Sequence, residues 1–119
     1  MMKTNIAEIL NQHNTVQFAY LFGSYTEGTQ NDSSDIDIAV YMDDISLDAR
    51  LTLPYALEKV LKKEIDLVVL NEVKNMYLLE AILAKGLVLN EHEDRAFFEV
   101  KKNHEIIDFK NFRRYIDAA

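Results

Sequence analysis

Short apolar runs alternate along the chain with longer segments in which apolar residues recur every three or four positions. The short runs are rich in β-branched and aromatic side chains, a composition that is typical of strands. We therefore predict strands at residues 16–22, 35–41 and 65–70, with a short edge strand at residues 87–89.

The longer segments follow the helical period. They predict helices at residues 4–13, 47–63, 73–84 and 91–116. Pro54 lies inside the second helix and predicts a kink or a restart there, and Gly86 is expected to end the third. Helices and strands in this order predict an α/β (α+β) fold, with a small mixed β-sheet flanked by helices and a long C-terminal helix.

Composition narrows the class of protein further. The chain of 119 residues is expected to form one domain, 1–119, and its hydrophobic content of 49% is sufficient for an ordinary core. It has no cysteine, which excludes disulfides and thiolate metal sites. The net charge of -7 disfavours direct binding of nucleic acid. We see no signal peptide and no membrane-spanning run, so we expect a cytoplasmic protein.

The first candidate for chemistry is the pair Asp35 and Asp37, at the start of the second predicted strand. Residues two apart on a strand face the same side, which holds the two carboxylates at roughly 7 Å between their Cβ atoms. Ile36 and Ile38 then point into the core. Paired carboxylates raise each other's pKa unless a cation joins them, and Mg2+ prefers carboxylate oxygens as ligands. The alternative is a solvated Asp-x-Asp at a strand edge.

The second candidate is Gly23-Ser24, which follows the first predicted strand. Glycine lets the backbone approach a ligand closely, and a serine at the start of a helical turn can present its hydroxyl and amide to a phosphate. The alternative is structural, because residues 24–27 also have the S-x-x-E form of a capping box, whose turn Gly28 would end. The two interpretations are compatible.

Together, Gly23-Ser24, ten further residues and the Asp35-x-Asp37 pair form the motif of the DNA polymerase beta-like nucleotidyltransferases. Within that superfamily the chain resembles the minimal nucleotidyltransferases (MNT), small proteins that occur beside HEPN-domain proteins in prokaryotic toxin–antitoxin pairs. The resemblance implies the nucleotidyltransferase fold and a third carboxylate on a neighbouring strand. Asp66, near the start of the third predicted strand, matches that position; the alternative is a strand-start or helix-capping charge.

The resemblance also implies a reaction, the Mg2+-dependent transfer of AMP from ATP to a protein hydroxyl. On this hypothesis Asp35, Asp37 and Asp66 bind two Mg2+ ions, and Asp66 is the general base. Gly23 and Ser24 hold the triphosphate. The implied acceptor is a tyrosine of a cognate HEPN ribonuclease toxin, so that the chain acts as antitoxin; both a homo-oligomer and a hetero-oligomer stay open.

Two other functions stay open at this point. One is a non-catalytic antitoxin that masks the toxin by binding it, and a departure from the family motif favours it. Relatives often carry arginine after Gly-Ser, whereas residues 25–27 are Tyr, Thr and Glu. With two Mg2+ ions bound, a triphosphate and three aspartates still leave roughly three negative charges, which Arg50, Lys62 and Lys63 are candidates to offset. The other open function is a transferase that acts on a small molecule such as an aminoglycoside.

The last predicted helix, residues 91–116, carries more apolar residues than a single buried stripe requires. This surplus favours one of two arrangements. Either the helix packs widely across the core, or part of its surface is a protein interface, with a second copy or with another chain.

Overall fold

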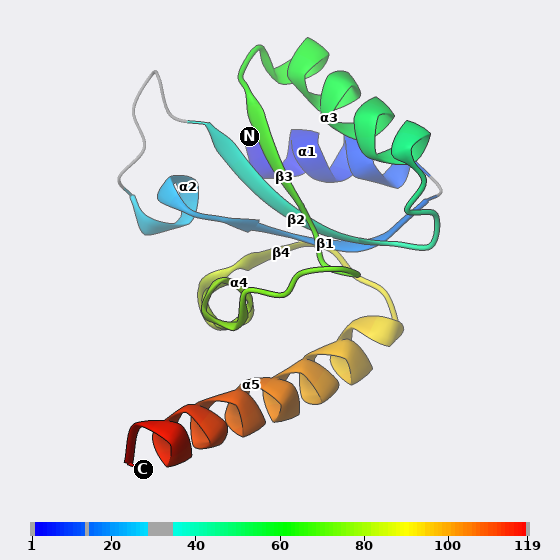
Figure 1. The fold of residues 1–119 in the computed structure, drawn as a ribbon. Coiled ribbons are helices and arrows are strands. Elements are labelled where there is room, and N and C mark those ends of the chain that lie inside the picture. The colour runs from blue at the N-terminus through cyan, green and yellow to red at the C-terminus, as the bar shows by residue number, and fades with distance from the viewer. Residues whose placement is uncertain (1, 14, 29–34, 119) are drawn as a thin grey trace.

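The structure, a computed structural model, describes residues 2–13, 15–28 and 35–118, and its strands form one sheet (Figure 1). The strands are β1 (Val16–Phe22), β2 (Ile36–Met42), β3 (Ile65–Val69) and β4 (Leu87–Asn90). Their order across the sheet is β3-β2-β1-β4. β2 and β3 run parallel, whereas β1 is antiparallel to both β2 and β4. The expected small mixed sheet, with the last strand at its edge, is therefore confirmed.

Helices cover both faces of this sheet, as Figure 1 shows. They are α1 (Met2–Asn11), α2 (Ser24–Glu27), α3 (Leu47–Leu61), α4 (Met76–Lys85) and α5 (Asp94–Ala118). α1 and α3 pack on one face, and α4 and α5 lie on the other. Each of the four helices predicted from the sequence is present, with ends within three residues of the expected positions. The predicted fold class is confirmed.

Alternation along β2 decides which side chains reach which face. Ile36 and Ile38 are fully buried, as expected, in a core cluster that they share with residues of α1 and α3. Ala39 belongs instead to the cluster formed with α4 and α5. Because Asp37 lies between the two isoleucines, its side chain is on the α4 and α5 face of the sheet.

The ends of the helices have local causes. The Ser46 side chain accepts a hydrogen bond from the Ala49 N–H at 3.3 Å and so caps the start of α3. Pro54 lies inside α3, which is one continuous helix, so the restart that we considered there does not occur. Gly86 ends α4 as expected, and its N–H donates to the Ile82 carbonyl at 2.8 Å.

The first half of α5 is fixed to the sheet by apolar and polar contacts. Phe98 and Ile106 are buried, at 7% and 4% exposure. The Tyr20 hydroxyl donates to Glu99 Oε1 at 2.6 Å, and Arg95 donates to the same oxygen. Burial of the Tyr20 hydroxyl is the main cause that raises its pKa above the ordinary value, and the hydrogen bond to Glu99 raises it further. The opposite side of α5 faces away from the sheet (Figure 1).

Within the described residues, no helix has the length and apolar character needed to span a membrane.

Candidate active site

Asp37 and Asp66 are direct neighbours on adjacent strands. In the parallel register of β2 and β3, Asp37 pairs with Asp66, and the pair falls near the first residue of each strand. Neighbouring strands lie about 4.8 Å apart and paired residues share a face, so the two carboxylates project together. We predicted Asp35 as the first residue of the strand, but β2 begins one residue later, and Asp35 directly precedes it. The charge of Asp35 still acts on Asp37. The parallel pairing thus brings three carboxylates to one end of the sheet.

The pKa of Asp37 reflects the closeness of these carboxylates. Burial raises the pKa of the Asp37 carboxyl above its ordinary value, and the charge of Asp66, a hydrogen bond to Asp66 and the charge of Asp35 raise it further. Ionising Asp37 beside these charges, in the absence of a cation, is therefore unfavourable.

We expect this raised pKa to make the metal-free protein less stable as the pH rises. Unfolded aspartates titrate near 3.8, whereas folded Asp37 keeps its proton to a higher pH. Its contribution to the free energy of unfolding is thus fully present below pH 3.8 and is lost as the pH rises through the folded-state pKa. Thermal melts of wild type and Asp37→Asn, in EDTA across this range, measure the effect. Wild type should lose stability relative to the variant; a difference that is constant with pH contradicts it.

Gly23 places the backbone against the Asp37 carboxylate. It has φ +76° and ψ -149°, a region that is essentially open to glycine alone. A Cβ atom at this position would lie 2.1 Å from Asp37 Oδ2. The carboxylate therefore occupies the space that any other residue would fill, and Gly23, Asp37 and Asp66 form one compact group.

Ser24 is the first residue of α2, and Gly23 is its N-cap, with no side-chain capping hydrogen bond. The capping-box interpretation of Ser24 is therefore wrong, because the turn begins one residue earlier than that motif requires. Thr26 holds the turn instead: its N–H and its hydroxyl both donate to the Gly23 carbonyl, at 3.0 and 2.8 Å. Gly28 ends the turn in the left-handed conformation, as expected. Residues 29–34 of the polar segment lie outside the described residues.

The donor set at this end of the sheet fits a hard divalent cation. Carboxylate oxygens are the ligands that Mg2+ prefers, and the repulsion that raises the pKa of Asp37 is of the kind that a cation relieves. In the part of the chain that the structure describes, no three acidic or histidine side chains already stand in ligand positions. The three aspartates would therefore have to turn toward an ion on binding it.

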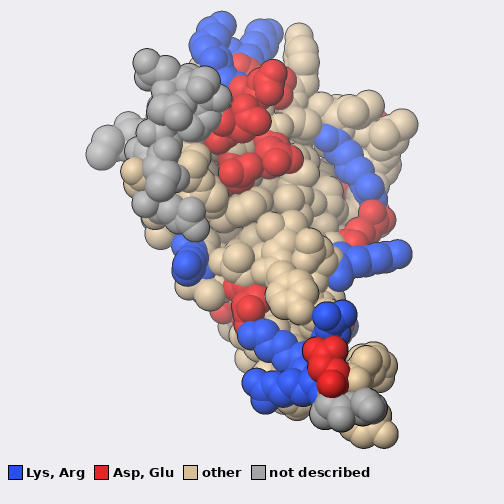
Figure 2. Space-filling view, turned by 60° about the vertical axis from the view of Figure 1, so that its left-hand side comes forward, with Lys and Arg blue, Asp and Glu red and all other residues tan. Residues whose placement is uncertain are grey.

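Basic side chains lie near this acidic group (Figure 2). Figure 2 shows acidic side chains gathered on this face, with lysine and arginine side chains beside them. Lys62 and Lys63 lie in the turn between α3 and β3, three or four residues before Asp66. Arg50 lies at the other end of the sheet, where it forms an ion pair with Glu72 at 2.6 Å. Its position removes Arg50 from the candidates that could offset a bound triphosphate at the aspartates.

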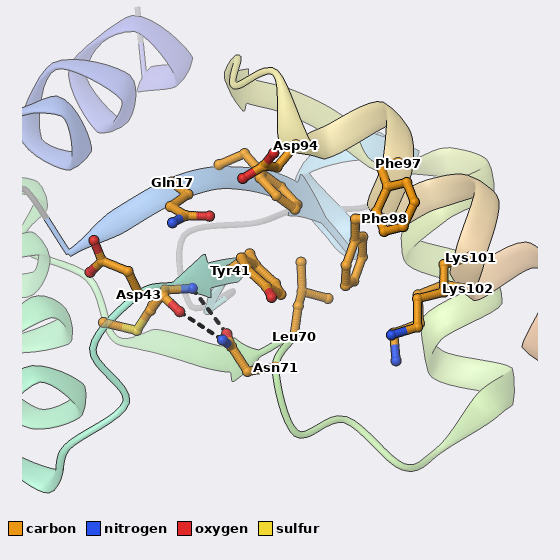
Figure 3. A pocket seen from close by; sticks show the side chains of 12 residues that line it. Gln17, Tyr41, Asp43, Leu70, Asn71, Asp94, Phe97, Phe98, Lys101 and Lys102 are labelled. Atoms are coloured by element: carbon orange, nitrogen blue, oxygen red, sulfur yellow. Dashed lines mark hydrogen bonds between the residues drawn. The ribbon is translucent and has the colours of Figure 1, made fainter.

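A cavity of about 610 Å³ lies at the end of the sheet opposite to these aspartates (Figure 3). Its lining includes Tyr41, Asp43, Phe98 and Lys101, and none of the three aspartates contributes to it. Asp43 follows β2 six residues after Asp37, which corresponds to roughly 20 Å along the strand. No pattern in the sequence indicated this cavity, because α5 forms one of its walls and the packing of that helix was not predictable.

Comparison with known proteins agrees with this geometry. The family model described as polymerase beta, nucleotidyltransferase, matches residues 4–95, a segment that contains Gly23, Ser24 and all three aspartates. The chain therefore belongs to the polymerase beta nucleotidyltransferase family. The family resemblance seen in the Gly-Ser and Asp-x-Asp motif is confirmed.

Individual relatives point to one group within this family. Protein adenylyltransferase MntA from Shewanella oneidensis is 38% identical over 88 residues, which are 72% of this chain and 63% of MntA. This match thus spans less than two thirds of that relative. A chain in the crystal structure of a toxin–antitoxin with AMP-PNP has a TM-score of 0.83 and 32% identity, over 99% of this chain and 97% of its own. A tri-AMPylated Shewanella oneidensis HEPN toxin in complex with MNT antitoxin contains a chain with a TM-score of 0.76 and 28% identity, covering 98% and 93%.

Proposed function

We propose that this chain is a protein adenylyltransferase that transfers AMP from ATP to a tyrosine hydroxyl of a cognate HEPN ribonuclease toxin and so acts as an antitoxin in the cytoplasm. The observation that carries the proposal is the pairing of Asp37 with Asp66 against the backbone of Gly23. Support comes from the similar protein named as an adenylyltransferase, and from the two similar toxin–antitoxin structures, one with AMP-PNP and one with an AMPylated toxin.

Asp35, Asp37 and Asp66 would hold two Mg2+ ions. When bound, these ions supply neutralisation of the triphosphate and a lower pKa for the attacking hydroxyl. Gly23 and Ser24 would position the phosphates, because the glycine backbone lies within contact of Asp37 and leaves no side chain in the way. Lys62 and Lys63 lie closest along the chain to Asp66 and would offset part of the remaining negative charge.

The proposed reaction is a substitution at the α-phosphorus of ATP. The tyrosine oxygen attacks the α-phosphorus, a new P–O bond forms, and the bond from the α-phosphorus to the bridging oxygen breaks. Pyrophosphate leaves with that oxygen. The hydroxyl proton passes to the carboxylate of Asp66, the proposed general base. Holding acceptor and phosphate in line is the contribution of the rigid strand ends and the Gly23 turn.

The test is incubation of the chain with ATP labelled at the α-phosphate, Mg2+ and the HEPN-domain protein encoded beside it. We expect label on a tyrosine of the toxin, and we expect none after Asp35→Ala together with Asp37→Ala. Label transfer that survives this double substitution contradicts the site. A double variant that transfers no label yet still neutralises the toxin shows instead a purely binding antitoxin.

A further inference from the structure

The cavity of about 610 Å³ lies between the sheet and the first turns of α5, and the proposed reaction does not use it (Figure 3). Its volume is in the range of small-molecule sites, roughly 300–1,000 Å³. Of the twelve residues that line it, seven are polar or charged and five are apolar. A lining of this kind is suited to a small ligand that has both a flat apolar part and polar groups.

Aromatic rings form a rigid wall of this cavity. The Phe18 and Tyr41 rings stack at 5.0 Å between centroids, and Phe98 packs edge to face against both, at 5.3 and 5.2 Å. Phe18 is fully buried and Phe98 is 7% exposed, so the core fixes both rings. Phe97 is 73% exposed, so the wide packing of α5 across the core that we considered does not include it. A wall of fixed rings can receive a flat ring without rearrangement of these side chains.

Two polar side chains of the lining are free to bind a ligand. In the part of the chain that the structure describes, the side chains of Gln17 and Lys101 form no hydrogen bond and no ion pair. Asn71, by contrast, is occupied by two hydrogen bonds to the backbone of β2, at 2.9 and 2.6 Å, which Figure 3 marks with dashed lines. Lys102 is shared with Glu105, at 3.2 Å. Gln17 thus offers an amide donor and acceptor, and Lys101 offers an ammonium group.

These polar groups lie at different ends of the cavity. Figure 3 shows Gln17 and Lys101 on opposite sides of the space. Asp94 begins α5, and Lys101 follows seven residues later, about 10 Å along the helix axis. A ligand that fills the cavity therefore meets hydrogen-bond acceptors at one end and ammonium groups at the other.

The summed charge of the cavity limits what it can hold. Its lining has two aspartates and two lysines, which sum to zero, and Glu105 beside Lys102 brings the total to -1. Arg95 pairs with two glutamates of its own helix and supplies no free charge. A triphosphate, with about four negative charges, would be left largely uncompensated here. One phosphate group carries about -1.5 to -2 and can be held by Lys101 together with Lys102, so the cavity fits one phosphate group rather than three.

A purine nucleoside monophosphate combines these features. Adenine and guanine are flat rings with an exocyclic amino group on one edge, and the phosphate lies at the other end of the nucleotide, beyond the ribose. The amide of Gln17, with a donor and an acceptor, can pair with the edge of either base. A free aromatic amino acid does not fit, because its ammonium and carboxylate groups are bonded to the same carbon and cannot reach both ends of the cavity.

We propose that this cavity is a second nucleotide site, which binds a purine nucleoside monophosphate without a divalent ion. The base lies against the rings of Tyr41 and Phe98. Its amino-bearing edge is directed toward Gln17, and the phosphate lies on Lys101. None of the three aspartates lines the cavity, so this site does not depend on the proposed function and makes no use of its metal ions.

The experiment is calorimetric titration of the full chain with AMP and, separately, with GMP, in EDTA so that no divalent ion is available to the aspartates. We expect at least one of the two to bind, with Kd below about 1 mM. UMP has a smaller base without an amino group and should bind at least about tenfold more weakly.

Two substitutions place the nucleotide in the cavity. Gln17→Leu removes the amide and Lys101→Ala removes the ammonium group, and each should weaken binding at least about tenfold. The matched controls are Gln12→Leu and Lys59→Ala, the same changes at exposed residues that do not line the cavity. Both controls should bind within about twofold of wild type.

Several results overturn this inference. One is that neither AMP nor GMP binds wild type in EDTA while label still reaches the toxin in Mg2+, in which case the proposed function stands and only the second site fails. Another is that UMP or inorganic phosphate binds as tightly as the purine nucleotides, because then the base is not recognised. Equal losses in the variants and their controls would place the nucleotide outside the cavity. Loss of AMP binding after Asp35→Ala together with Asp37→Ala would place it at the aspartates.

Discussion

Gly23→Ala should abolish most of the transferase activity, lowering kcat/KM at least about a hundredfold. The new methyl group would lie 2.1 Å from Asp37 Oδ2, so the carboxylate must move. A displacement of about 1 Å in a catalytic group can cost a hundredfold in rate. The φ of +76° with ψ -149° adds strain of about 1–3 kcal/mol, which should appear as a lower Tm. Steady-state release of pyrophosphate and a thermal melt measure the two effects.

Gly28→Ala is the matched control for this prediction. Gly28 has nearly the same φ, +75°, but a Cβ atom there would meet nothing within 4 Å. Its left-handed conformation should cost only about 1 kcal/mol of stability, and activity should stay within about twofold of wild type. If Gly28→Ala lowers activity as much as Gly23→Ala does, strain in the turn, rather than contact with Asp37, explains both losses.

Asp37→Asn should lower AMP transfer by about a thousandfold or more without destabilising the fold. The change keeps the shape of the side chain but removes the charge that would bind a divalent ion, and an interaction of several kcal/mol with the transferred phosphate is lost with it. It also ends the repulsion from Asp66 and Asp35 that raises the pKa of the native carboxyl. We therefore expect the Tm at neutral pH, without metal, to be unchanged or higher. Labelled transfer and a melt in EDTA test the two halves separately.

The control is Asp43→Asn, the same substitution at an exposed aspartate just after the other end of β2. It changes the net charge by the same amount, so any general effect of charge is shared by both variants. Asp43→Asn should keep activity within about twofold. Asp37→Asn that remains active, or that loses activity only as far as it loses stability, removes this carboxylate from the proposed site.

Much of this arrangement was predictable because it depends on local periodicity. The strand at residues 16–22 coincides with β1, since its apolar run is bounded by polar residues and by Gly23. Ile36 and Ile38 are buried because alternation on a strand leaves them no other face. The pattern of apolar residues alone did not predict that Asp66 lies beside Asp37. It came from the family resemblance, since parallel pairing between distant strands has no local signature.

The remaining features arise from tertiary packing that a single sequence does not encode in its spacing. Arg50 was a candidate to offset the triphosphate, yet the direction of β2 carries it to the other end of the sheet, beside Glu72. The contact of Gly23 with Asp37 depends on the register of β1 and β2, in which Phe22 pairs with Asp37. The outward side of α5 was ambiguous because its apolar residues fit both burial and an interface.

The most direct test of the account is a crystal structure of the chain with Mn2+ and a non-hydrolysable ATP analogue. The anomalous scattering of Mn2+ identifies its position in the crystal directly. We expect Mn2+ within roughly 2.5 Å of the carboxylate oxygens of Asp37 and Asp66, with the phosphates over the Gly23 turn. Mn2+ and triphosphate bound elsewhere, for example in the cavity beside α5, with the aspartates free of metal, would contradict the central claim that these three carboxylates form the catalytic site.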